Sequence, residues 1–472
     1  MRSAIVLFLG FLGSAPVAQA LTLDEFIQKV TKQNNNIQSQ KLDEEASKLR
    51  ASEGYLLTSP NYFLSGTYAS DKKQSQNPTF EGNQRFGSEL QTGFEQQSRY
   101  GINHKLYYAI TNQKIEGADP TFLQNSSVSI SSFNYEFTLP IWRNGFGRST
   151  QDQVEMIVEQ NKSDSFAARF KQKQERAFAI ATYWKLKSAQ ELYLLSKELL
   201  SSNQNFLKWT KNRFQDRLSE NIDLKQAEAA VALREFELNQ AEAELLEAQQ
   251  AFNELLEVAT DTPVPELESL PDAEKWPARS KASDNLTRED ILSLESLLKV
   301  QDAQSRVASD GTKPQLDFLG HVSTNGLDQN SRESFDRSLT TKNPYYSVGL
   351  KFSIPLDRLN VDNVQKSAKV RASGTEAQLN RKRFELKTEL DKLDRNFAQA
   401  MKVYTSAKAV EKAQLEKLEM ESARRRSGRT TTFQLLSFQQ EYQASKQARI
   451  RALNLLLQIN AQFTLFTDGS SL

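Results

Sequence analysis

Hydrophobic and polar residues alternate in several short runs of this chain, a period typical of β-strands with one apolar face. Two of these runs end in the same way, as "FNYEFTLP" at 133–140 and "VGLKFSIP" at 348–355. Proline lacks the N–H that a strand donates to its neighbour, so Pro140 and Pro355 mark strand ends, and Trp142 follows the first of them. The pattern therefore predicts that the chain builds the same strand ending twice.

A different period follows each strand ending and indicates long helices. Ten positions from Leu224 onward, spaced alternately three and four residues apart, include nine apolar residues, and the ten positions 211 residues further along include eight. A heptad seam of this length predicts coiled-coil packing. The proline-free segments 146–215 and 359–427 would each form a helix about 105 Å long. We expect each long helix to pack against two shorter coaxial helices.

Matching segments indicate an internal duplication. "LTLDEFI" at 21–27 returns as "LTREDIL" at 286–292. The separation of matched residues falls from 254 (Tyr62 and Leu316) to 215 (Pro140 and Pro355), so the first repeat carries about 39 additional residues. Two further alternating runs within them predict an added β-hairpin.

The predicted organisation begins with a secretory signal peptide at 1–20, which has a basic Arg2, a short apolar run and a small-residue ending at 18–20. The first repeat (21–285) contains a helix, strands at about 61–141, a helical hairpin at 146–258 and a Pro-rich connector at 259–285. The second repeat (286–472) contains a helix, strands at about 314–355 and a helical hairpin at 359–467. Export and the lack of any later run of about 20 apolar residues leave a barrel as the only means of spanning a membrane.

Composition narrows the chemistry. The 60 Lys and Arg residues balance 59 Asp and Glu residues, so charge gives no indication of a nucleic-acid partner. The chain has no cysteine, which excludes disulfides, thiolate metal sites, thiol catalysis and lipidation of an N-terminal Cys. His104 and His321 both fall in strand-like runs and are interpreted as residues of polar strand faces. Sequence motifs for phosphate binding or hydrolysis are absent, so we expect neither an enzyme nor a cofactor.

The ordered set of a signal peptide, "LTLDEFI", "FTLPIW" followed by "RNGFG", the turn "NRFQDRLSENIDLKQAEA" and a second copy resembles the TolC-like outer membrane efflux proteins, or outer membrane factors. The resemblance covers the chain from Leu21 to about Asp468. It implies an α+β membrane protein: a homotrimer whose outer-membrane β-barrel continues as a long α-helical coiled-coil tunnel through the periplasm of a Gram-negative bacterium. The implied partners are a periplasmic adaptor (membrane fusion) protein, an inner-membrane transporter and outer-membrane lipid.

The resemblance also implies that the tips of the two helical hairpins narrow the tunnel and meet the adaptor. At the first tip, Arg217 stands where the family usually has glycine, and Ser219 is well placed to cap the returning helix. Asp223 is favourable near the positive end of that helix and is a candidate for the tunnel constriction.

The second tip is basic. Arg425, Gly428 and Arg429 are candidates for adaptor docking, with Gly428 suited to a left-handed turn. The arginines could instead be solvated charges of the rim. Gln434 and Ser437 occupy the positions where the family has an acidic constriction, and neither is charged.

These observations predict a passive outer-membrane exit duct of a tripartite efflux or type I secretion system that exports small molecules or proteins. The alternative is a periplasmic coiled-coil scaffold or adhesin whose strands form a soluble head.

Overall fold

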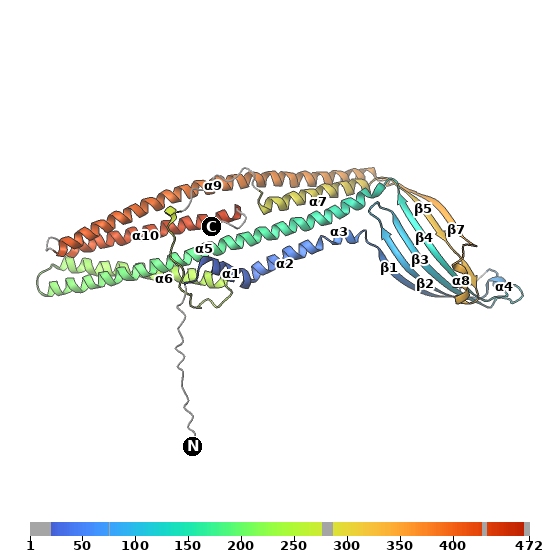
Figure 1. Cartoon of the computed structure of the whole chain (residues 1–472), viewed down its shortest axis with the longest axis horizontal. Coiled ribbons are helices and arrows are strands. Elements are labelled where there is room, and N and C mark those ends of the chain that lie inside the picture. The colour runs from blue at the N-terminus through green and yellow to red at the C-terminus, as the bar shows by residue number, and fades with distance from the viewer. Residues whose placement is uncertain (1–19, 75, 276–286, 427–431, 467–472) are drawn as a thin grey trace, which may run out of the picture. The chain divides into compact units, whose positions relative to one another are not determined.

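A computed structural model describes residues 20–74, 76–275, 287–426 and 432–466 (Figure 1). The helices are α1 (Leu23–Gln33), α2 (Asn35–Arg50), α3 (Glu53–Leu56), α4 (Pro78–Glu81), α5 (Arg148–Gln215), α6 (Asn221–Leu255), α7 (Glu289–Gly311), α8 (Ser331–Ser338), α9 (Arg358–Arg426) and α10 (Thr432–Phe463). The strands are β1 (Asn61–Asp71), β2 (Gln84–Gln97), β3 (Asn103–Glu116), β4 (Ser127–Pro140), β5 (Gln315–Ser323), β6 (Gly326–Asp328) and β7 (Tyr345–Ser353). None of the helices in these ranges combines the length and apolar character needed to cross a membrane.

The chain forms two compact units, and both take segments from each predicted repeat. The helical unit is drawn from Met1–Leu42, Ala168–Arg288 and Phe384–Leu472. The sheet unit comprises Asp43–Ala167 and Glu289–Arg383. The helices α5 and α9 contribute residues to both units, so the compact units cut across the predicted repeats.

The helical unit has a core in which the first helix is anchored by aromatic packing. Thr22 and Glu25 form a capping box that starts α1. The ring of Phe26, which is fully buried, stacks on that of Phe252 at a centroid distance of 4.3 Å. The hydroxyl of buried Tyr183 donates to the carbonyl of Leu21 over 2.6 Å, which satisfies a polar group inside this apolar core.

A buried arginine connects α5, α9 and the residues that follow α10 in the helical unit. Arg288 is 5% exposed, and its guanidinium lies 4.9 Å from the ring centroids of both Phe170 and Phe466. It also pairs with Glu389 at 3.1 Å. Ion pairing and two cation–π contacts offset the cost of burying this charge.

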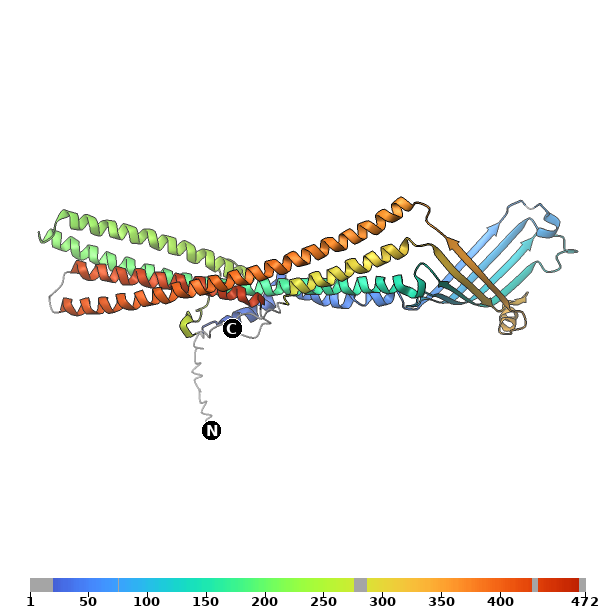
Figure 2. The ribbon, with the colours of Figure 1, turned by 90° about the horizontal axis from the view of Figure 1, so that it is seen from above.

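All seven strands belong to one antiparallel sheet with the order β1-β2-β3-β4-β5-β7, and β6 pairs with β4 beyond the end of β5 (Figure 1 and Figure 2). The predicted added hairpin is present as β2 and β3. It lies between β1 and β4, so it is part of the sheet itself.

The register gives the sheet an apolar face and a polar face. Tyr62 of β1, Phe94 of β2 and Leu106 of β3 stand opposite one another on the apolar face. His104 also lies on the apolar face, so the prediction that it belongs to a polar face is wrong. The position of a residue along the strand, and not its type, decides which face its side chain joins. Its ring nitrogen Nδ1 lies 2.8 Å from the hydroxyl of Tyr135, which satisfies the imidazole there. His321 does lie on the polar face, opposite Glu136.

The helices of the sheet unit are joined by charged side chains. Arg306 of α7 binds Asp152 and Glu155 of α5 at 2.7 and 2.6 Å. On its other side, α7 meets α9 through the ion pair of Glu295 with Arg383 at 2.6 Å. These contacts fix α7 between the two long helices within this unit.

Candidate functional site

The first candidate surface is the tip between α5 and α6, in the helical unit. Leu218 donates its N–H to the carbonyl of Arg213 at 2.8 Å, and Arg217 donates to that of Phe214 at 3.0 Å. These two bonds form a Schellman motif, whose C′ position is usually glycine. Arg217 occupies it with a left-handed φ of 59°. A tight turn therefore forms at this tip although arginine stands where the family usually has glycine.

The returning helix α6 begins one residue later than predicted. Its N-cap is Glu220, so the assignment of Ser219 as the cap is wrong. The Ser219 hydroxyl donates instead to Oδ2 of Asp223 at 2.8 Å, and the N–H of Glu220 donates to the same oxygen at 3.1 Å. These hydrogen bonds, the Ser219 bond foremost, hold the pKa of the Asp223 carboxyl below its ordinary value. Asp223 thus carries its charge at the positive end of α6.

The second tip joins α9 to α10, and the free ends of both hairpins lie at the same end of the helical unit (Figure 1 and Figure 2). Arg425 is exposed near the end of α9, whereas Gly428 and Arg429 lie outside the described residues. Gln434 is exposed and Ser437 is half-buried in the first turns of α10. The roles of these residues in docking and constriction stay predictions.

The two hairpins touch near their tips. Gln440 of α10 donates to Oδ1 of Asn203 on α5 at 3.0 Å, and Asn203 is only 1% exposed. The rings of Phe206 and Phe433 lie 6.5 Å apart on the same two helices. The heptad pattern did not indicate this polar contact, because Asn203 and Gln440 are ordinary polar residues in the sequence.

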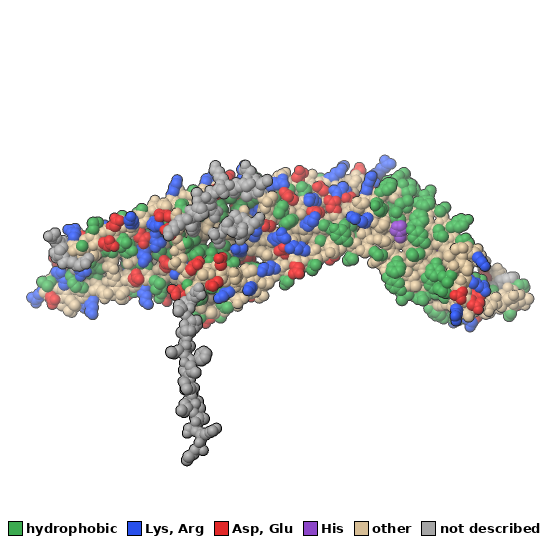
Figure 3. Space-filling model, viewed as in Figure 1, with side chains coloured by type: hydrophobic (Ala, Val, Ile, Leu, Met, Phe, Trp, Pro, Cys, Tyr) green, Lys and Arg blue, Asp and Glu red, His purple; other side chains and the backbone are tan. Residues whose placement is uncertain are grey.

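The second candidate surface is the apolar face of the sheet, which is exposed to a degree unusual for large hydrophobic residues. On β7, Tyr346, Val348 and Leu350 are 77%, 77% and 70% exposed. Figure 3 shows hydrophobic side chains gathered over the sheet, whereas charged side chains are spread along the helices. An exposed apolar area of this kind marks a surface that contacts lipid or another protein.

Charged side chains on the apolar face are confined to one end of it. Within the described strands they are Lys114, Glu116 and Asp328, all at the end of the sheet farthest from Pro140. Lys114 pairs with Glu116 at 2.7 Å. The helix α8 covers the same end through Ser334, whose hydroxyl lies 2.8 Å from that of Ser131. The remainder of the face presents no charge to its surroundings.

The sheet also has two free edges. Among the described strands, β1 pairs only with β2, and β7 pairs only with β5. Nearly every residue of both strands is exposed. Unpaired edges of this length are a hazard for a soluble protein, because they present free backbone N–H and C=O groups to other chains.

The predicted strand ends lead into a junction that the sequence patterns did not reveal. Pro140 is the last residue of β4, Pro355 follows β7 by two residues, and the ring of Trp142 meets that of Phe352 edge-on at 6.1 Å. Trp142 is half exposed.

Asn144 organises this junction. It has a left-handed φ of 58°, and its N–H donates to Oδ2 of Asp310 at 2.6 Å. Its side chain accepts from the N–H of Thr150 at 3.0 Å and donates to the Thr150 hydroxyl at 2.8 Å. Gly147 packs against the β2–β3 turn so closely that a Cβ would lie 2.1 Å from the carbonyl oxygen of Arg99. The glycines of "RNGFG" were the only available indication of this close packing.

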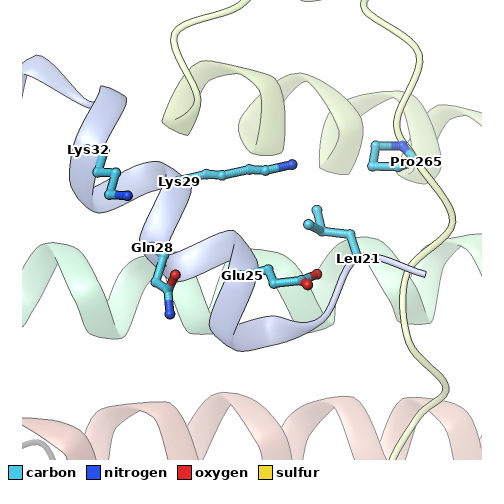
Figure 4. A pocket seen from close by; sticks show the side chains of 6 residues that line it. All are labelled: Leu21, Glu25, Gln28, Lys29, Lys32 and Pro265. Atoms are coloured by element: carbon cyan, nitrogen blue, oxygen red, sulfur yellow. The ribbon is translucent and has the colours of Figure 1, made fainter. Parts of the chain in front are cut away.

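One open pocket of the helical unit is lined by four charged or polar residues and by two apolar residues, Leu21 and Pro265 (Figure 4). The side chain of Glu25 points toward Leu21, and that of Lys29 extends toward Pro265. Leu21 pairs with Leu267 in a short parallel bridge, so the pocket lies where the Pro-rich connector holds the start of α1. No group of side chains suited to binding a metal ion occurs among the described residues.

Comparison with known proteins identifies the fold. No protein-family model and no curated protein matches the sequence. The outer membrane protein VceC from Vibrio cholerae is 12% identical, with a TM-score of 0.62 over 94% of this chain and 95% of VceC. The outer-membrane channel OprN is 16% identical, with a TM-score of 0.65 over 95% and 90%. The open outer membrane channel MtrE from Neisseria gonorrhoeae is 16% identical, with a TM-score of 0.64 over 94% and 88%. This chain therefore has the fold of TolC-like outer membrane channels, as its sequence predicted.

Proposed function

We propose that this chain is a passive exit duct in the outer membrane of a Gram-negative bacterium. The observation that carries the proposal is the sheet: an exposed, almost uncharged apolar face combined with two free edges. A soluble head would leave both features in contact with water. In a membrane barrel, the apolar face contacts lipid and the edges pair with other copies, so both features are satisfied.

The order of the strands fits closure by identical copies. Six strands run in alternating directions from β1 to β7, so β1 of one copy and β7 of the next would pair antiparallel. Three copies, the number implied by the resemblance to TolC-like proteins, would supply eighteen strands. Barrels of about this strand number enclose an aqueous channel. The polar face would then line the lumen.

The helical unit would continue this duct through the periplasm. Its hairpin tips would meet a periplasmic adaptor, through Arg217 and Ser219 at the first tip and Arg425, Gly428 and Arg429 at the second. Gln434, Ser437 and Asp223 are the candidates for a tunnel constriction. An inner-membrane transporter would supply the energy, in either a tripartite efflux or a type I secretion system, and the cargo would be small molecules or proteins.

Crosslinking of the sheet edges tests this assembly. Each of three variants carries one cysteine at Ser65 of β1 and a second on β7, at Ser347, Gly349 or Lys351. Because the chain has no cysteine of its own, the introduced pair is the only thiol pair present. We expect oxidation in outer-membrane fractions to give covalent trimers for at least one partner position. The control combines Ser65→Cys with Thr111→Cys on the central strand β3, and it should give none. Monomers with every β7 position, or extraction of the protein by salt alone, would contradict the proposal and favour the periplasmic scaffold.

A further inference from the structure

One row of side chains on the polar face crosses the whole sheet at a single level. Cross-strand pairing joins its members in order: Asn61, Glu95, Lys105, Glu136, His321 and Ser347. We call this row the belt. Each copy brings two carboxylates and one ammonium group to it.

The ammonium group of the belt is engaged by aromatic rings. Nζ of Lys105 lies 4.8 Å from the ring centroid of Phe63 and 4.7 Å from that of Tyr107. The hydroxyl of Tyr107 donates to Oε1 of Glu136 at 2.7 Å, which fixes the position of this carboxylate. The ring faces attract the lysine charge and hold it beside the belt. Glu95 and Glu136 are the two carboxylates at this level.

The rest of the polar face, like the belt, has a net negative charge. Its other charged strand residues are the carboxylates of Asp71, Glu89 and Asp317 and the cations of Arg85 and Lys351. Acidic groups therefore outnumber basic groups over the face as a whole. Of the constriction candidates in the helical unit, Gln434 and Ser437 carry no charge and Asp223 is acidic, so variants of the polar face itself are needed to assign an ion preference to it.

We propose that the belt makes the lumen of the barrel select cations over anions, with Glu95 and Glu136 as the selecting residues. This inference rests on the proposed function, in which three copies close the barrel around the polar face. The belt then becomes a ring of six carboxylates and three ammonium groups at one level. Rings of acidic side chains raise the local concentration of cations and exclude anions.

The test measures reversal potentials of the purified full-length protein in planar bilayers across a KCl gradient. We expect the wild type to prefer K⁺. The double variant Glu95→Gln/Glu136→Gln leaves the Lys105 ammonium groups alone in the ring, so its reversal potential should change sign toward Cl⁻ preference. Lys105→Met should shift the reversal potential in the opposite direction. Glu333→Gln on α8, which is outside the polar face, is the matched charge control and should behave as wild type.

The outcomes separate the two proposals. Wild-type protein that forms no channel would overturn the exit duct and the belt together. Channels of wild-type conductance whose ion preference is unchanged in both the double variant and Lys105→Met would overturn the belt while the duct stands. Because the two variants must shift the preference in opposite directions, a folding defect in one of them cannot imitate the expected result.

Discussion

Replacing Gly147 by alanine should open the junction between β4 and α5. Gly147 has a φ of 74°, a region that costs an L-residue about 1–2 kcal/mol. Its new Cβ would also lie 2.1 Å from the carbonyl oxygen of Arg99 and 2.5 Å from the carbonyl carbon of Tyr100. Both of these atoms belong to backbone, so relief requires the β2–β3 turn to move. The backbone conformation alone therefore sets a lower limit on the destabilisation.

Hydrogen exchange read by mass spectrometry measures this effect locally. A loss of 1–2 kcal/mol corresponds to about a 5–30-fold increase in the population of opened states, and hence in exchange rate. We expect this increase at the turn 98–102 and in the first turn of α5. Helices of the helical unit should exchange as in the wild type, which shows that the protein remains folded.

Gly145 provides a matched control two residues away. Its φ is not in the left-handed region, and a Cβ there would have no atom within 4 Å. Gly145→Ala should therefore change local stability by no more than about 0.5 kcal/mol. Equal exchange at 98–102 in the two variants would refute the reasoning, because it would mean that neither the positive φ nor the close approach constrains the junction.

Three further predictions concern the helical unit. Arg217→Gly should slow hydrogen exchange at the first tip. The change relieves about 1–2 kcal/mol of left-handed strain, which exceeds the about 0.4–1 kcal/mol that is lost because glycine gives the unfolded chain more conformational freedom. Faster exchange would contradict the Schellman assignment. The pKa of Asp223 is lowered in the folded state, so its contribution to the start of α6 is present above the ordinary pKa of about 3.9 and is lost as pH falls through the folded value. Hydrogen exchange in the first turn of α6, corrected for the intrinsic exchange rates of the amides, should therefore accelerate below about pH 4 in the wild type. The variant Asp223→Asn should show no such acceleration. Arg288→Lys keeps the charge but loses the planar contact with two phenyl rings, and melting followed by circular dichroism should show a loss of about 1–2 kcal/mol; an unchanged melting curve would mean that the rings contribute nothing.

The periodic parts of this fold could be predicted from the sequence, and the turns could not. Alternation placed β2 and β3 as an added hairpin, because a period of two is a direct consequence of strand geometry. The cap at Glu220 was missed by one residue, since Ser219 has the better capping chemistry and only the three-dimensional course of the chain decides between them. The residue type of Arg217 does not favour a left-handed conformation; only its place where the family usually has glycine hinted at it, and the neighbouring hydrogen bonds impose it.

In the proposed assembly, the added hairpin sets the diameter of the barrel independently of the helices. In a closed ring of three copies, β2 and β3 account for one third of the strands, and barrel diameter grows roughly in proportion to strand number. Without the hairpin, β1 and β4 would still run antiparallel and could become neighbours, giving a complete but narrower barrel. The number and length of the helices would not change. If the proposed assembly forms, gain or loss of a single hairpin would thus change the diameter of its pore during evolution and leave the helices that face the proposed periplasmic partners unchanged.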